Sequence, residues 1–342
     1  MMKAAILVKQ KAPLEIAEIE LPQKMEYGQV LVRVLFSSIC GAQLNEIDGV
    51  KGEDKFLPHL LGHEGSGLVE ETGPGVTKVK KGDRVVMHWR RGDGLQGPTP
   101  KYLWGGKTVN AGWVTTFNEY AVSSENRLTP ITNQTDLKTA TLYGCALTTG
   151  YGVVHHDSHL KSGESLVVFG AGGAGSGIIM MAKLINAYPL VAVDINKFKL
   201  NEALKMGASH SLLNSPKIRQ DLEKILGLQG ADVTIDTTGI NAVRELAYET
   251  ASTAGRTILV GVPKKGEKMA IDSFPLHFDK ALTGSFGGDV NPSLVIPRLI
   301  KLEEQGILRP EKMITKTYPL LKINEAIKEV RTGDVIRVAI RL

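Results

Sequence analysis

The chain has few cysteines, no long apolar run and no large excess of either charge over its 342 residues. Its two cysteines, Cys40 and Cys145, are too few for a disulfide framework and favour a reducing compartment, so we expect a cytoplasmic protein. No stretch approaches the roughly 20 apolar residues that span a bilayer. The apolar run near the N-terminus, four residues long, is too short for a signal-peptide core. We therefore predict no membrane partner.

The charges are nearly balanced, with 41 lysines and arginines against 36 aspartates and glutamates. The basic residues are spread along the whole length, so nucleic acid is not required as a partner. A small-molecule substrate, with some preference for an anionic one, is enough to account for these charges. The length suits two domains that each bury a core of their own.

The most informative stretch is 166–180, where four apolar residues end in a glycine-dense turn and a helical run follows. Gly170, Gly172 and Gly175 stand in G-x-G-x-x-G register, with Gly173 between them. The first glycine permits the turn, the second lets the backbone approach a pyrophosphate, and the third lets the helix pack on the strand. The N–H groups at the start of the helix are then available to the phosphates.

A second apolar run, 190–193, ends in Asp194, nineteen positions after Gly175. A carboxylate at this place binds both hydroxyls of an adenosine ribose and repels a 2′-phosphate, so NAD is predicted over NADP. A glycine-rich turn without a ligand is the alternative. The strand, helix and acid that accompany the turn argue against it.

From residue 165 onward, strands and helices alternate with short turns, which is typical of a parallel, doubly wound sheet. The expected strands are 166–169, 190–193, 211–213, 232–236 and 257–260, and the expected helices are 176–186, 197–206, 217–226 and 241–250. Thr237, Gly261 and Val262 follow two of these strands. They belong to the edge at which such sheets bind ligands.

The first part of the chain has short, alternating apolar runs separated by glycines, which predict a compact, mostly β domain. Its expected strands are 3–9, 14–20, 30–36, 85–87 and 117–122. Residues 88–113 differ in composition and are expected to form an irregular lobe with little regular structure. A strand at 281–286, a helix at 292–305 and a return to β at 335–342 complete the prediction.

The segment 62–76 reads Gly-His-Glu-Gly-Ser-Gly-Leu-Val-Glu-Glu-Thr-Gly-Pro-Gly-Val, which has the pattern G-H-E-x-x-G-x5-G-x2-V. Together with Lys-Gly-Asp-Arg-Val at 81–85 and Thr-Thr-Gly-Tyr-Gly at 148–152, it resembles the zinc-containing medium-chain dehydrogenase/reductase (alcohol dehydrogenase) family. The likeness covers residues 3–342.

That resemblance implies an α/β protein of two domains. A GroES-like, mostly-β catalytic domain would occupy 1–147, with 286–342 returning to it. A Rossmann dinucleotide-binding domain, a doubly wound parallel sheet, would occupy 148–285. The strand around 282–286 resembles the family's dimer edge, which implies a homodimer or homotetramer.

The resemblance also implies a metal site. Cys40, His63 and Cys145 stand at the family's ligand positions, and a catalytic zinc takes three ligands of these types and leaves one position open. Glu64 resembles the family's alternative carboxylate ligand. Zinc would lower the pKa of a hydroxyl bound to it, as alcohol oxidation requires. Singly, each cysteine is more often a buried small hydrophobe and the histidine a satisfied core residue, and a Cys40–Cys145 disulfide is a further alternative.

The family's structural zinc needs four closely spaced cysteines in the 88–113 lobe, which has none, so we predict one zinc per chain. Three of the residues that follow Cys40 also differ from the family's usual pattern. Ala42 lacks the hydroxyl that relays the alcohol proton, and Asn45 replaces the terminal histidine base. Gln43 replaces the carboxylate that orients the histidine ligand, and an amide adds less basicity. The proton must therefore leave by water, by Glu64 or by a substrate hydroxyl.

Further contacts are implied by position. Thr149 resembles the residue near the nicotinamide, Lys199 the lysine beside the ribose, and Arg337 the arginine at the pyrophosphate. For the last two, a solvated surface charge is the alternative. Gly41 stands where some members place a phosphate-binding arginine or histidine.

For the substrate, Trp89 falls where the family has a pocket aromatic, and Asn45 is the second candidate contact. A sugar face could pack on the indole, while the alternative is that Trp89 only holds the lobe together. We predict hydride transfer between NAD(H) and a secondary alcohol or its ketone. The preferred substrate class is a polyol, cyclitol or sugar derivative with negative charge. The alternatives are a zinc-independent medium-chain reductase and a non-catalytic NAD(H)-binding protein.

Overall fold

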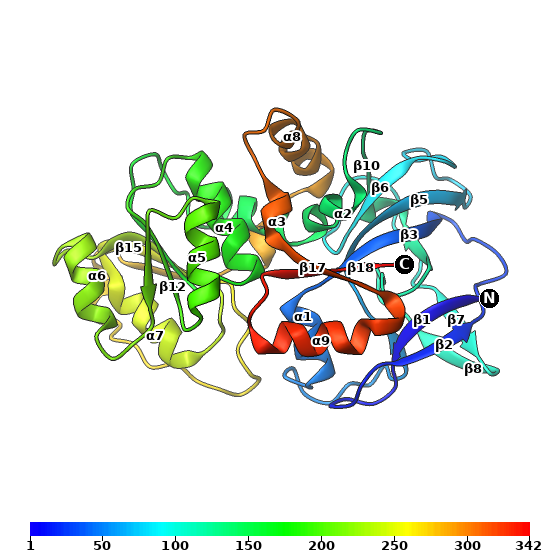
Figure 1. The fold of residues 1–342 in the computed structure, drawn as a ribbon, viewed down its shortest axis with the longest axis horizontal. Helices are drawn as coiled ribbons and strands as arrows, with labels where there is room; N and C mark the ends of the chain where they lie inside the picture. The colour runs from blue at the N-terminus through cyan, green and yellow to red at the C-terminus, as the bar shows by residue number, and fades with distance from the viewer. The chain divides into compact units, whose positions relative to one another are not determined.

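The computed structural model describes residues 1–342, which divide into two compact units (Figure 1). The first unit consists of Met1–Cys145, Asn291–Thr332 and Arg337–Leu342, and the second of Ala146–Val290 and Gly333–Ile336. The boundaries differ from the predicted ranges 1–147, 148–285 and 286–342 by a few residues, and the short segment 333–336 belongs to the second unit. None of the helices combines the length and apolar character needed to cross a bilayer.

The first unit contains two sheets. The smaller has the strand order β2-β1-β4-β8-β7. Its strands are β1 (Met2–Leu7), β2 (Glu15–Ile19), β4 (His59–Leu60), β7 (Lys101–Trp104) and β8 (Lys107–Asn110). The larger has the order β10-β6-β5-β3-β18-β17, with β9 also paired to β3. Its strands are β3 (Gln29–Ile39), β5 (Glu64–Thr72), β6 (Arg84–His88), β9 (Tyr120–Ser124), β10 (Leu128–Pro130), β17 (Ile314–Pro319) and β18 (Arg337–Arg341).

Strand β3 organises the larger sheet, because it pairs with β5, β9 and β18. Its alternate residues Val30, Val32 and Val34 are fully buried in a core shared with β5 and β6, as period-two alternation predicts. The last strand, β18, runs antiparallel to β3, so the C-terminal segment returns to the first unit. The unit's helices are α1 (Gly41–Ile47), α2 (Leu137–Ala140), α8 (Pro292–Glu304) and α9 (Ile323–Thr332).

The prediction of an irregular 88–113 lobe is wrong in part, because β7 and β8 form an antiparallel hairpin there. Gly105 and Gly106 connect them with φ values of 54° and 77°. Two consecutive positive φ angles are the requirement of the tight type I′ hairpin turn. Tyr102 and Val109 face each other across the hairpin and are fully buried. The Gly-Gly pair between alternating apolar residues was the sequence signal for it.

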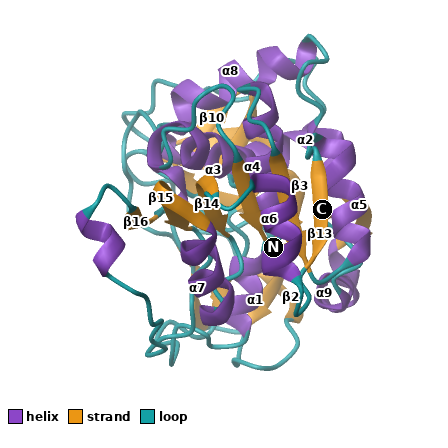
Figure 2. Ribbon diagram, turned by 90° about the vertical axis from the view of Figure 1, so that its left-hand side faces the viewer, coloured by secondary structure: helices purple, strands orange, loops and turns teal.

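The second unit is built on a parallel sheet of order β13-β12-β11-β14-β15-β16, which confirms the predicted doubly wound arrangement. Its strands are β11 (Leu166–Phe169), β12 (Leu190–Asp194), β13 (His210–Leu213), β14 (Ala231–Asp236), β15 (Ala251–Leu259) and β16 (Ala281–Gly284). Its helices are α3 (Ala146–Gly152), α4 (Gly173–Leu184), α5 (Lys197–Met206), α6 (Ile218–Leu226) and α7 (Asn241–Thr250). Figure 2 shows β13, β14, β15 and β16 in orange among the purple helices.

The core of this sheet follows from the alternation within each strand. Val167 and Phe169 of β11 pack with residues of β12, α6 and α7 in one cluster. Helix α4 contacts β11 and β12, and α5 contacts β12 and β13. The strand order reverses between β11 and β14, which places the carboxyl ends of these two strands at the switch point where such sheets bind ligands.

Candidate functional site

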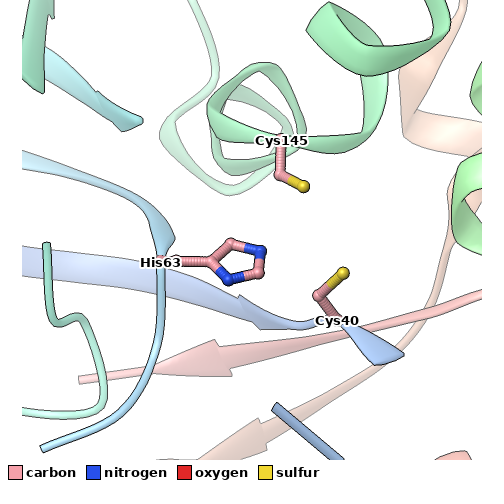
Figure 3. A group of neighbouring side chains, drawn as sticks. All are labelled: Cys40, His63 and Cys145. Atoms are coloured by element: carbon pink, nitrogen blue, oxygen red, sulfur yellow. The ribbon is translucent and has the colours of Figure 1, made fainter. Parts of the chain in front are cut away.

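Cys40, His63 and Cys145 converge from three separate segments of the first unit. Cys40 lies between β3 and α1, His63 directly precedes β5, and Cys145 follows the 3-10 helix η2 (Thr141–Gly144). Their ligand atoms all lie within 4.8 Å of one another. Figure 3 shows both sulfur atoms and the imidazole directed toward one common space. Both cysteines are free, so the structure does not have the alternative disulfide.

A glycine makes this convergence possible. A Cβ added at Gly144 would lie 2.4 Å from the carbonyl oxygen of Met87 and 2.8 Å from the Cβ of Glu64. No side chain fits in that space, so only glycine lets η2 pack directly on β5 and β6. This close packing brings the next residue, Cys145, to His63.

The imidazole of His63 is held by Gln43 on α1. The Oε1 of Gln43 accepts the backbone N–H of Cys40 at 2.9 Å, and its amide nitrogen lies 2.5 Å from His63 Nδ1. Gln43 is almost completely buried. The other ring nitrogen, Nε2, is buried and has no hydrogen-bond partner. Since Nδ1 is engaged by Gln43, Nε2 is the ring nitrogen through which a metal would have to bind.

The electrostatics of the site favour a thiolate at Cys40. A hydrogen bond with Cys145 holds the pKa of the Cys40 thiol well below its ordinary value, against the effect of burial, and Arg337 acts in the same direction. The same pairing and burial raise the pKa of Cys145. Burial lowers the pKa of His63, but the interaction with Cys40 outweighs it and the net shift is upward. Of the two cysteines, Cys40 is therefore the one that favours the thiolate form.

Glu64 and Arg337 form a buried ion pair next to these residues. The Oε1 of Glu64 accepts from Arg337 Nη1 at 2.9 Å and from the Ser38 hydroxyl at 2.7 Å. Burial raises the pKa of Glu64 in spite of Arg337. Burial lowers the pKa of Arg337, but the negative charges of Cys40 and Glu64 raise it more, so it stays protonated. The guanidinium also donates to the Ile39 carbonyl at 3.1 Å.

These groups fit a zinc ion. Two thiols and one imidazole are the donor types of catalytic zinc sites, and an unpartnered buried nitrogen is costly unless something binds it. Cys40, His63 and Cys145 would hold the metal. Glu64 lies outside this group because its carboxylate turns toward Ser38 and Arg337. Its role as an exchangeable ligand stays a prediction.

A cavity of about 810 Å³ is lined by Gln43, Asn45 and His63, so it reaches one of the three candidate metal ligands. This volume is in the range of small-molecule sites. Its other side chains include five charged ones, two aromatic ones and a histidine: Glu46, Lys51, Glu53, Asp54, Lys55, Phe56, Trp113 and His59. His59 Nε2 lies 2.7 Å from Asp54 Oδ2. The cavity offers polar and aromatic contacts within the first unit.

The predicted substrate residues are placed differently. Asn45 lines the cavity, but Trp89 does not, and the indole in its wall belongs to Trp113, which is 48% exposed. Trp89 lies under the Arg90 guanidinium, 5.4 Å from the ring centroid. The sequence analysis assigned the pocket aromatic to Trp89 and missed Trp113, which lies 24 positions further along the chain. Its position after β8 becomes visible only once the hairpin is recognised.

The glycine-rich turn has the geometry that nucleotide binding needs. Gly170 has a φ of 92°, and a Cβ on Gly175 would lie 1.9 Å from the Gly170 carbonyl oxygen. A Cβ on Gly172, by contrast, would meet no atom within 4 Å, so the turn leaves open space at this position. Gly173 begins α4. The third glycine thus serves helix packing, and the second leaves room for a ligand.

The other predicted cofactor residues of the second unit lie around this turn. Asp194 ends β12, and its carboxylate accepts the backbone N–H of Ala171 at 2.8 Å. Thr237 donates from its hydroxyl to the Gly170 carbonyl at 2.9 Å. A Cβ on Gly261 would lie 2.1 Å from the Gly239 nitrogen. These contacts hold the carboxyl ends of β12 and β14 against the turn that follows β11, and the segment after β15 against the segment after β14.

The remaining predicted contacts stay predictions. Thr149 is buried on α3, next to Gly150, which packs against Gly177 of α4. Val262 is 53% exposed, and Lys199 lies in the first turn of α5. Arg337 is almost fully buried against Glu64, so it is not the solvated surface charge that was the alternative.

The family models match both parts of the chain. The model described as alcohol dehydrogenase GroES-like domain matches residues 26–133, and the model described as zinc-binding dehydrogenase matches residues 173–303. The NDMA-dependent alcohol dehydrogenase of Amycolatopsis methanolica is 30% identical to the chain, over 98% of this chain and 97% of that protein.

Two solved structures show the same fold over the whole chain. An alcohol dehydrogenase zinc-binding domain protein from Burkholderia ambifaria has a TM-score of 0.90 at 27% identity, covering 100% of this chain and 98% of that one. The 2R,3R-butanediol dehydrogenase from Bacillus subtilis has a TM-score of 0.80 at 25% identity, covering 100% of both. The chain therefore belongs to the zinc-dependent medium-chain dehydrogenase/reductase family, and it is an alcohol oxidoreductase. Both the predicted family and the predicted fold class are confirmed.

Proposed function

We propose that this protein is an NAD-dependent oxidoreductase with one catalytic zinc per chain, which interconverts a secondary alcohol and its ketone. The convergence of Cys40, His63 and Cys145, with His63 also lining a cavity, is the observation that carries the proposal. When bound there, zinc supplies Lewis-acid chemistry that makes a hydroxyl more acidic. The 88–113 lobe has no cysteine, which supports a single zinc.

The chain's own residues prepare this site. Gln43 holds the His63 ring in place. Arg337 compensates the buried charges of Cys40 and Glu64. Since position 42 is alanine, no hydroxyl relays a proton there. Exposed residues such as Lys51 line the cavity, which supports release of the alcohol proton to water.

NAD is the proposed cofactor because Asp194 ends β12 at the position that meets the adenosine ribose. We expect Asp194→Asn to lower the ratio of kcat/KM for NAD to that for NADP at least tenfold, because the isosteric amide no longer repels a 2′-phosphate. Initial rates with each nucleotide check this. An unchanged ratio would remove Asp194 from cofactor selection.

The proposed substrate class is a polyol, cyclitol or sugar derivative with negative charge. Lys51 and Lys55 in the cavity support an anionic group, and Trp113 supports packing of a sugar face. The name of the butanediol dehydrogenase relative supports a compound with neighbouring hydroxyls. Because Glu46 and Glu53 also line the cavity, the preference for negative charge is tested by comparing substrates in pairs, one neutral and one anionic. We expect the anionic member of each pair to have the lower KM, and Lys51→Gln/Lys55→Gln to abolish the difference.

The first experiment is elemental analysis of zinc, with an activity screen on secondary alcohols and ketones. We expect one zinc per chain in the native protein and in His59→Gln, and less than 0.1 in His63→Gln. His59 is the matched control because it also lines the cavity but lies outside the ligand group. Activity should fall at least a hundredfold in His63→Gln, since the Lewis acid is lost.

Two results would favour the other functions. Turnover that persists after complete chelation of zinc would indicate a zinc-independent reductase. Tight NADH binding without turnover of any alcohol or carbonyl compound would indicate a non-catalytic binding protein. Two zinc ions per chain would mean that the lobe holds a second ligand set.

We also propose that the protein is found in a compartment that keeps both cysteines reduced, as the cytoplasm does. We propose further that two copies of the chain associate through β16. Strand β16 is the edge of the parallel sheet, and edge strands invite pairing with another chain. Phe274 and Phe278 in the preceding segment are 67% and 59% exposed. A mass from light scattering of two or four times 37.0 kDa would support the proposal, and a 37.0 kDa species would contradict it.

A further inference from the structure

Gln43 contacts both the backbone of one predicted metal ligand and the side chain of another. Its Oε1 accepts the Cys40 N–H at 2.9 Å, and its amide nitrogen lies 2.5 Å from His63 Nδ1. The residue is 1% exposed, so water does not replace either partner. Each terminal atom of the amide therefore has one assigned partner.

The orientation of this amide is determined by the backbone. A main-chain N–H is always a donor, so the atom of Gln43 that faces Cys40 must be the carbonyl oxygen. The NH2 group is then the atom that faces His63. If the amide were turned over, its NH2 would face the Cys40 N–H, and two buried donors would face each other without a hydrogen bond. The positions of the amide oxygen and nitrogen of Gln43 therefore follow from the Cys40 N–H, which can only donate.

This orientation determines the tautomer of His63. An NH2 group donates, so Nδ1 must accept and carries no proton. In a neutral imidazole the proton is then on Nε2. Nε2 is the buried nitrogen without a hydrogen-bond partner. It is also the nitrogen that a metal needs as an electron-pair donor, so the tautomer favoured by Gln43 is the one that cannot bind metal.

A carboxylate at position 43 would behave differently. Both of its oxygens accept, so it can take the Cys40 N–H and an Nδ1–H of His63 together, which leaves Nε2 free for a metal. With Gln43, the proton must instead move from Nε2 to Nδ1, where it meets the amide NH2. The amide must then turn over, and the Cys40 N–H loses its acceptor. Metal binding therefore costs the protein the buried hydrogen bond between the Cys40 N–H and Gln43.

We propose that Gln43 is a positioning residue that holds His63 as the Nε2–H tautomer and thereby makes zinc at Cys40, His63 and Cys145 weakly held and exchangeable. The inference rests on the proposed zinc site. It concerns how tightly the site holds the metal, whereas the proposed function concerns whether the metal is there and what reaction follows.

The first test needs no variant at position 43. The full-length protein is labelled with 15N-histidine, stripped of metal, and its imidazole signals are recorded by long-range 1H–15N correlation. Comparison with His63→Gln identifies the His63 signals. At a pH at which the His63 ring is neutral, we expect a protonated Nε2 and an unprotonated Nδ1. A protonated Nδ1 in the neutral, metal-free ring would overturn the inference.

The second test compares zinc affinities of full-length proteins by competition with a chromogenic chelator. Gln43→Glu replaces the NH2 by an oxygen at nearly constant shape, and we expect it to bind zinc about tenfold to hundredfold more tightly, the usual size of such effects. The same variant should show Nδ1–H in the NMR experiment. Equal or weaker affinity would overturn the inference.

Asn45→Asp is the matched control for charge. It adds the same negative charge on the same helix, beside the cavity, without a hydrogen bond to His63. We expect less than a threefold change in zinc affinity. An increase as large as that of Gln43→Glu would assign the effect to charge and overturn the inference. If neither the native protein nor any variant binds zinc, the proposed function itself fails.

Discussion

Glu64 and Arg337 form a buried ion pair, with side-chain exposures of 0% and 3%. Burying two charges is costly, and their attraction compensates for it only while both are present. Arg337 also lies near the Cys40 thiol, whose pKa it lowers. The pair therefore links the stability of the first unit to the charge of the metal site.

We expect Arg337→Gln to lower the free energy of unfolding by about 3–5 kcal/mol, because it leaves the Glu64 carboxylate buried without its counter-charge. The double variant Glu64→Gln/Arg337→Gln should recover at least half of this loss. Urea unfolding of the two single variants and the double variant, all saturated with zinc, measures the coupling. Additive losses in the double variant would show that the two residues stabilise the protein independently.

At the scale of the element, the turn between β11 and α4 separates two uses of glycine. Gly175 allows contact between backbone segments, since its Cβ would lie 1.9 Å from the Gly170 carbonyl oxygen. Gly172 adjoins open space, and its φ of −75° is accessible to any residue. One glycine serves the fold and the other serves the proposed ligand.

The two alanine variants should therefore differ. Gly175→Ala is expected to destabilise the second unit by several kcal/mol, because backbone must shift to admit the methyl group. Gly172→Ala should leave the melting temperature within about 2 °C but weaken NADH binding at least tenfold, because its methyl group occupies the space left for the pyrophosphate. Differential scanning fluorimetry and fluorescence titration with NADH measure both. Normal NADH binding by Gly172→Ala would contradict the role of this glycine.

At the scale of the whole molecule, His88 makes the stability of the fold depend on pH. Its ring is completely buried at the end of β6, donates from Nδ1 to the Arg90 carbonyl at 2.8 Å and lies 3.0 Å from the Thr129 hydroxyl. Burial lowers its pKa to about 3. The unfolded chain protonates this histidine near pH 6.5, so the folded state loses stability as the pH falls from 6.5 toward 3.

We expect the native protein to lose about 1.6 kcal/mol of unfolding free energy through His88 between pH 6.5 and pH 5, since one proton corresponds to 1.36 kcal/mol per pH unit and the unfolded histidine is half protonated at pH 6.5. His88→Asn keeps a donor for the Arg90 carbonyl and has no ionisable ring, so this contribution should disappear. Urea unfolding at both pH values, at equal zinc saturation, gives the difference. Parallel pH dependence in the two proteins would show that His88 is protonated in the folded state.

Local sequence signals predicted much of this architecture. The alternation of apolar residues in β3 and the glycine register before α4 depend on near neighbours in the chain, so the strands and the βα turn could be recognised directly. The hairpin β7–β8 was missed although its Gly105-Gly106 turn is also a local signal. Helix α4 begins at Gly173, three residues before the expected start, because the turn glycines themselves adopt the first helical turn.

The family, the two-domain α/β architecture and the set of candidate ligands could all be predicted from the sequence, because each depends on residue types at fixed spacing. Which groups meet across long separations becomes visible in the folded chain. It pairs Arg337 with Glu64, brings Trp113 and not Trp89 into the cavity wall, and sets the Gln43 amide between Cys40 and His63. The contacts of Gln43 with His63 and of Arg337 with Glu64 join residues 20 and 273 positions apart, and spacing along the chain does not encode the direction in which a side chain points.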